Sequence, residues 1–163
     1  MSFTTFDPRT LGTPVYEALT QLRSHYDQAL ADAKISDKVY RNHLKEQKNQ
    51  AVELYTYLST WGLMRLRAEE IALCNVKPPD PHPDQLSVEK KAARNQEGKR
   101  EVIQEFFRCL ETLSLTPNLT LDQLKVSAMN TDDYLGLTGL GLAVAQEFSF
   151  WASVVYPDIS GQE

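Results

Sequence analysis

Apolar residues recur at helical steps of three and four along most of the chain, and this period restricts the fold more than any other feature. The alternation of apolar and polar residues that is typical of strands does not persist, and no Asn-Gly turn joins two alternating runs. With 163 residues, 42% of them hydrophobic, the chain can bury one core without disulfides or metals. We therefore predict an all-α fold, a compact single-domain helical bundle of about five to seven helices with no β-sheet.

Capping residues and helix breakers divide the pattern into separate helices. Thr13-Pro14 resembles an N-cap followed by a proline in the first turn, which predicts a helix from Pro14 to about Ala33. Ser36-Asp37 predicts the start of a long second helix that continues to Leu73, with a kink or a close helix contact at Gly62. Later helices are predicted from Ser87 to Gly98, across an amphipathic stripe from Val102 to Leu113, from Thr120 to about Ala128, and from Thr131 onward.

Four prolines between Asn75 and Pro83 form the clearest break, because no helix passes through such a segment. We predict a Pro-rich linker at 75–86 between an N-terminal helical part (14–74) and a C-terminal helical part (87–156). Neither part is large enough for a substantial core of its own, so both are assigned to one domain that covers residues 1–163.

The last helix carries the sharpest apolar pattern. One line along it holds Tyr134, Leu137, Gly141, Val144, Phe148, Trp151 and Val155. This spacing predicts a central core helix. Glycines at 136, 139 and 141 lower helix propensity, which predicts a compensating close contact with another helix.

Charge is distributed unevenly along the sequence. The formal net charge is −5, yet residues 34–100 carry a net +4 and residues 101–163 a net −7. The two cysteines, Cys74 and Cys109, form no Cys-x-x-Cys pair, which fits a reducing, cytoplasmic location. Residues 1–13 show no basic run followed by an apolar stretch, and no segment is long and apolar enough to cross a membrane, so we expect a soluble protein that is not exported.

A row of cations on the second predicted helix is the strongest candidate for a binding surface. Its members are Lys34, Lys38, Arg41, Lys45 and Lys48, at steps of four, three, four and three. Side chains at this spacing project from one helical face, which suits a phosphate backbone. A second cluster, more interrupted by acids, consists of Lys90, Lys91, Arg94, Lys99 and Arg100, and its first three members are included in the predicted RNA site. A merely solvated charged face remains the alternative for both clusters.

No motif indicates catalysis, a cofactor or a metal. The sequence lacks a phosphate-binding Gly-x-x-x-x-Gly-Lys loop and a Gly-x-Ser-x-Gly elbow. His25, His43 and His82 lie in different segments without metal-ligand spacing, and each is predicted to be a surface or capping histidine. His82-Pro83-Asp84 matches the tripeptide of J-domains, but no basic helix ends directly at it, so the match is interpreted as chance.

The order of features resembles the small helical subunit of type III CRISPR effector complexes, the Cmr class in particular. The resemblance covers roughly residues 38–155. It includes a Leu-rich stretch that reaches Gly-Leu, 57–63 (YLSTWGL), the amphipathic helix 102–113, and a final helix that opens with 133–138 (DYLGLT) and closes on Phe148. The chain departs from the family at Gly139, Phe150 and Trp151, where members usually carry basic residues.

The resemblance implies a non-catalytic subunit that stacks in a filament with other copies of itself. Its other implied partners are the backbone and large subunits and the guide and target RNA, whose backbone the basic residues would contact. The runner-up interpretation is a helical protein-interaction or adaptor module with no nucleic-acid role.

Overall fold

The structure, a computed structural model, describes residues 7–76 and 79–160, and it is all-α over these ranges, as predicted. The predicted linker at 75–86 is therefore described except at residues 77 and 78, and residues 1–6 and 161–163 also lie outside the described ranges. The helices are α1 (Arg9–Ala31), α2 (Asp37–Cys74), α3 (Val88–Ala93), α4 (Glu97–Ser114), α5 (Leu121–Leu124) and α6 (Thr131–Val155), with a 3₁₀ helix η1 (Pro83–Gln85) in the linker.

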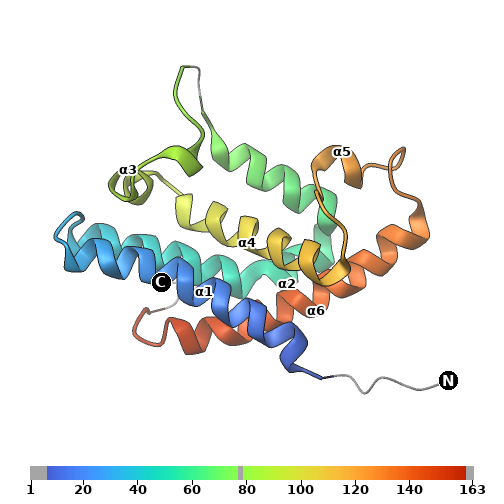
Figure 1. Cartoon of the computed structure of the whole chain (residues 1–163), viewed down its shortest axis with the longest axis horizontal. Helices are drawn as coiled ribbons and strands as arrows, with labels where there is room; N and C mark the ends of the chain where they lie inside the picture. The colour runs from blue at the N-terminus through green and yellow to red at the C-terminus, as the bar shows by residue number, and fades with distance from the viewer. Residues whose placement is uncertain (1–6, 77–78, 161–163) are drawn as a thin grey trace.

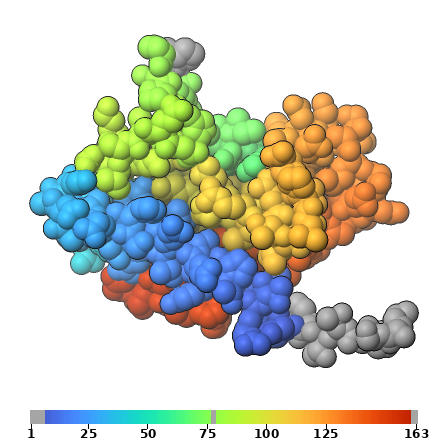
Figure 2. All heavy atoms as spheres, viewed as in Figure 1, coloured from blue at the N-terminus to red at the C-terminus, as the bar shows by residue number. Residues whose placement is uncertain are grey.

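Helix α4 lies at the centre of the bundle. Figure 1 shows α1 and the first half of α2 on one side of α4, and the second half of α2 on the other. The side chains of Ile103, Phe106 and Phe107 on α4 are fully buried, and α6 packs against α1, α2 and α4. Helices from both sides of the linker thus contribute to one hydrophobic core. On the face of the molecule seen in Figure 2, atoms from before and after the linker lie against one another.

Helix α2 is bent at Gly62, as predicted. Gly62 has φ 85° and ψ 173°, a conformation that favours glycine because a Cβ would be strained there. The hydroxyl of Tyr134 on α6 lies at this bend and accepts a hydrogen bond from the backbone N–H of Met64. The bend lets one long helix follow two sides of the core.

Three predicted helix starts are confirmed by side-chain caps. The hydroxyl oxygens of Ser36, Ser87 and Thr120 each accept a hydrogen bond from the backbone N–H three residues later. The helix after Thr120 is shorter than predicted and ends at Leu124. The last helix is capped by Asn130, one residue before the predicted start, through a 2.8 Å bond from the Asp133 N–H.

The predicted start of the first helix is wrong. Helix α1 begins at Arg9, where Asp7 caps the first turn by accepting the Arg9 N–H on Oδ1 and the Thr10 N–H on its carbonyl. Pro14 lies inside the helix. It deprives only the carbonyl of Thr10 of a helical donor, and because Thr10 is exposed, water can replace that donor.

The predicted helix from Ser87 to Gly98 is also wrong, because it is broken. Helix α3 ends at Ala93, and Gln96 adopts a left-handed conformation with φ 64° before α4 begins. The break allows α3 and α4 to run in different directions (Figure 1).

The predicted core stripe of the last helix is confirmed for its central members, Leu137, Val144 and Phe148, which are buried. The expected close contact holds for one of the three glycines. A Cβ on Gly141 would lie 3.3 Å from the side chains of Leu58 and Leu63, whereas the other two glycines, at 136 and 139, have open space around them.

Candidate functional site

The structure brings part of each predicted basic cluster to one end of the molecule. Helix α3 packs against α1, and Figure 1 shows it beside the turn that joins α1 to α2. We call this surface the basic end and define it by Lys34, Lys38, Arg41 and Lys90, all of which are exposed. Arg41 forms an ion pair with Asp37, whereas the ammonium groups of the three lysines have no hydrogen bond or ion pair among the described residues.

The predicted row on α2 is wrong at both ends. Lys34 lies in the segment between α1 and α2, before α2 begins at Asp37. Lys48 is half-buried, and its ammonium donates hydrogen bonds to the carbonyls of Tyr156 and Ile159, at 2.9 and 2.6 Å. These carbonyls follow the end of α6, where the helix dipole favours a cation. Lys48 is therefore a helix cap and is removed from the predicted RNA site, while Lys45 is half-buried without such a partner among the described residues.

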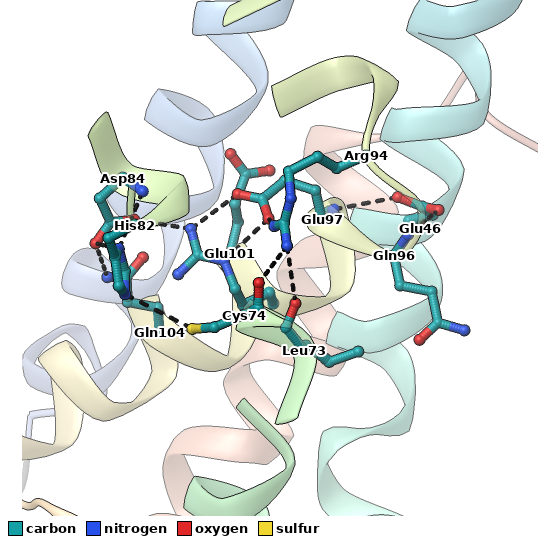
Figure 3. Close-up of polar contacts among 12 residues, drawn as sticks. Glu46, Leu73, Cys74, His82, Asp84, Arg94, Gln96, Glu97, Glu101 and Gln104 are labelled. Atoms are coloured by element: carbon teal, nitrogen blue, oxygen red, sulfur yellow. Dashed lines mark hydrogen bonds and ion pairs between the residues drawn. The ribbon is translucent and has the colours of Figure 1, made fainter. Parts of the chain in front are cut away.

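Arg94 in the second cluster is removed for the same reason. Its guanidinium donates hydrogen bonds to the carbonyls of Leu73 and Cys74 at the end of α2 and pairs with the buried carboxylate of Glu97 (Figure 3). Lys91 is half-buried and lines a pocket between α1, α3 and α4. Lys99 forms an ion pair with Glu69, and Arg100 is completely buried, so of the second cluster only Lys90 belongs to the basic end.

An acidic side chain on α2 caps α4 in the same manner. The two carboxylate oxygens of Glu46 accept the backbone N–H groups of Gln96 and Gly98, at 2.9 and 3.1 Å (Figure 3). Helices α2 and α4 approach so closely here that a Cβ on Gly98 would lie 2.7 Å from the carbonyl oxygen of His43. Glycine at position 98 is therefore required for this contact.

The bundle also contains a buried polar centre around Glu101, which the sequence interpretation missed. Glu101 Oε1 accepts hydrogen bonds from His43 Nε2 at 2.5 Å and from Gln47 at 3.2 Å, and Oε2 accepts the hydroxyl of Tyr26 at 2.6 Å. Tyr156 donates to Gln47 from the end of α6. The prediction that His43 is a surface or capping residue is wrong, because its side chain is buried and stacks on Tyr26.

The electrostatics of Glu101 depend on these donors. Burial alone would raise the pKa of this carboxyl group, but the hydrogen bonds from His43, Tyr26 and Gln47 outweigh burial and hold the pKa below its ordinary value. Burial and the adjacent charge of Glu101 raise the pKa of Tyr26, so its hydroxyl remains a donor. The centre therefore links α1, α2, α4 and the residue after α6 through one ionised carboxylate.

Cys74, His82 and Asp84 lie together in the linker region, as nucleophile, base and acid do in some hydrolases (Figure 3). The thiol sulfur is 3.6 Å from His82 Nε2. However, His82 Nδ1 accepts the backbone N–H of Asp84, so the ring proton lies on Nε2, facing the thiol. Burial, followed by the charge of Glu70, raises the pKa of Cys74. Because Nε2 carries the proton, His82 cannot take the proton of the thiol, and the raised pKa disfavours the thiolate, so we assign Cys74 no nucleophilic role.

The described part of the chain contains neither a group of metal ligands nor a membrane-spanning helix. Within residues 7–76 and 79–160, no three His, Cys, Asp or Glu side chains are grouped to hold a metal ion. No helix in those ranges has the length and apolar character that crossing a bilayer requires.

A comparison with known proteins finds no family model, no curated protein and no solved structure that matches this chain.

Proposed function

We propose that this chain is a non-catalytic small helical subunit of a type III CRISPR RNA-guided effector complex that contacts the RNA backbone through its basic end. The observation that carries the proposal is the position of helix α3, which carries exposed Lys90 and packs against α1 beside the turn that holds exposed Lys34. Exposed ammonium groups on flexible stems bind phosphates without selecting a base sequence. Such binding suits a complex in which the guide RNA supplies sequence recognition.

The local chemistry of the basic end is compatible with a polyanion. Asp37 pairs with Arg41, one of the four cations, and Asp32 accepts a hydrogen bond from Gln28, so the charge that no described acid pairs with comes from Lys34, Lys38 and Lys90. The lysines are not fixed by ion pairs among the described residues and can follow a curved strand. The proposed contact does not include the final helix, whose closing aromatic Phe148 is buried in the core.

Assembly with other subunits gives the proposal a direct test. The chain would be co-expressed with a tagged backbone subunit, the large subunit and a guide RNA from a type III locus of the same genome, and the purified complex would be analysed by mass spectrometry. The proposal expects this chain in the complex in several copies. A complex that forms fully and lacks the chain would contradict the proposal.

A second candidate, a helical interaction module without a nucleic-acid role, is favoured by exposed apolar side chains. Trp61 on α2 and Leu135 on α6 are 51% and 61% exposed, and Phe150 on α6 is 59% exposed. Side chains of this kind are enriched in the cores of protein interfaces. This candidate expects binding to a protein partner that is unaffected when Lys34, Lys38 and Lys90 are replaced by glutamine.

A further inference from the structure

A pocket of about 300 Å³ lies between α1, η1, α3 and α4, next to the buried polar centre. Cationic and neutral donors reach it from three elements: His25 from α1, Lys91 from α3, and Arg100 and Arg108 from α4. The pocket is distinct from the basic end, because none of the four residues that define that surface lines it.

The carboxylates that line the pocket are already occupied by partners. Asp84 accepts hydrogen bonds from Arg100 on Oδ1 and from Gln104 on Oδ2, at 2.7 and 2.9 Å (Figure 3). Both oxygens of Glu101 are taken by the buried polar centre. Glu105 forms an ion pair with Arg108. These carboxylates keep their charge, but their oxygens are already engaged, and none of them binds Lys91, His25 or the Nη1 atom of Arg100.

Three donors in the pocket wall have no partner. Arg100 is completely buried, and its Nε and Nη2 atoms bind Glu97 and Asp84, but its Nη1 forms no hydrogen bond. A buried donor without an acceptor is costly and rare, which makes it a marker of an absent ligand or water. The side chains of Lys91 and His25 also have no hydrogen-bond or ion-pair partner among the described residues.

We propose that this pocket binds a phosphate monoester, with oxygens held by Lys91, His25 and the Nη1 atom of Arg100. A phosphate monoester carries a charge of about −1.5 to −2 at pH 7 and three strong acceptor oxygens, which match donors from three separate elements. Since Arg100 lies beneath the pocket surface, binding requires the exposed side chains above it to adjust. The phosphate can belong to a free nucleotide or to the 5′ end of an RNA strand.

Isothermal titration of the full chain with inorganic phosphate, AMP and adenosine tests the proposal. We expect AMP to bind with a Kd below about 1 mM and adenosine to bind at least about tenfold more weakly. Lys91→Gln should weaken AMP binding about tenfold, whereas Lys125→Gln, which removes the same charge from an exposed position outside both the pocket and the basic end, should leave it unchanged. Equal effects of the two substitutions, or no AMP binding, would overturn the proposal.

A second readout uses the unaltered protein, so it remains informative if a variant folds poorly. In guanidinium NMR spectra of protein labelled on arginine, the Arg100 signals should shift when AMP is added, and the signals of exposed Arg9 should not. Unchanged Arg100 signals at saturating AMP would overturn the assignment. Short RNAs with a 5′-phosphate or a 5′-hydroxyl then distinguish a free nucleotide from an RNA end as the source of the phosphate. Only a site for RNA ends should bind the 5′-phosphorylated RNA more tightly than AMP.

Discussion

The hydroxyl oxygen of Tyr134 on α6 lies 3.1 Å from the backbone nitrogen of Met64 on α2 and accepts its hydrogen bond. The non-helical conformation of Gly62 interrupts the hydrogen-bond ladder of α2 just before this residue. A side chain that is seventy residues away in sequence thus replaces the carbonyl that a straight helix would provide. The relationship fixes the bend of α2 against the start of α6.

Tyr134→Phe should therefore lower the free energy of unfolding by about 1 kcal/mol, because the Met64 N–H loses its protein acceptor but remains near solvent. Tyr16→Phe is a matched control, since the Tyr16 hydroxyl has no hydrogen bond among the described residues. Urea denaturation of both variants measures the difference. Equal stability of the two variants would show that the hydroxyl does not hold the bend.

Gly98→Ala should destabilise the protein by about 2 kcal/mol or more, because the added methyl group would overlap the backbone of α2 at His43. Gly139→Ala should have the opposite effect and stabilise the protein by up to about 1 kcal/mol, since this helical position is exposed and has open space around it. Thermal denaturation followed by circular dichroism compares the two. A tolerated alanine at position 98 would contradict the close packing of α2 on α4.

How far the sequence determines these features depends on the distance between interacting residues. Helical periodicity and local caps such as Ser36 and Ser87 are encoded within a few residues, and they predicted most helices. The break before α4 depends on Glu46, which is fifty residues from Gln96 in sequence, and no local signal marks it.

The candidate site illustrates the same limit. The spacing of Lys34 to Lys48 predicts five cations on one helical face, but Lys34 lies before α2 begins, and the spacing does not show that the end of α6 lies against Lys48. Arg94 was likewise assigned to an RNA site, although it caps the end of α2. The one available signal for the buried centre was polar residues at helical spacing within an apolar face, namely His43 and Gln47 beside Leu44 and Ala51.

Lys48→Met should lower the free energy of unfolding by about 1–2 kcal/mol, because the carbonyls of Tyr156 and Ile159 lose a charged donor in a half-buried position. Lys45→Met, one turn earlier on the same face, should change stability by less than about 0.5 kcal/mol. Chemical denaturation of both proteins tests this contrast. If the two substitutions cost the same, Lys48 is not a helix cap.

Stability should fall in acid because of Glu101. Its pKa is lower in the folded protein than the ordinary value of 4.5, so the contribution of the ionised carboxylate is complete above that value. This contribution is lost as the pH falls below about 4.5 and through the folded-state pKa. Glu101→Gln should therefore reduce stability at pH 7 and flatten its decline between pH 5 and pH 3, as measured by urea denaturation. An unchanged acid decline in the variant would exclude Glu101 as the responsible group.

RNA affinity as a function of salt concentration tests the central claim most directly. Fluorescence anisotropy with a labelled single-stranded RNA would compare three proteins: the unaltered chain, a variant with Lys34, Lys38 and Lys90 changed to glutamine, and a control with Arg9, Arg65 and Lys125 changed to glutamine. The control loses the same charge from exposed positions outside the basic end. We expect the first variant to bind RNA about tenfold or more weakly than the unaltered chain. The slope of log affinity against log salt concentration should become shallower by about two, because fewer counterions are released, and the control should resemble the unaltered chain. Equal loss of affinity in both variants, or an unaltered chain that binds no RNA at low salt, would contradict the proposed role of the basic end.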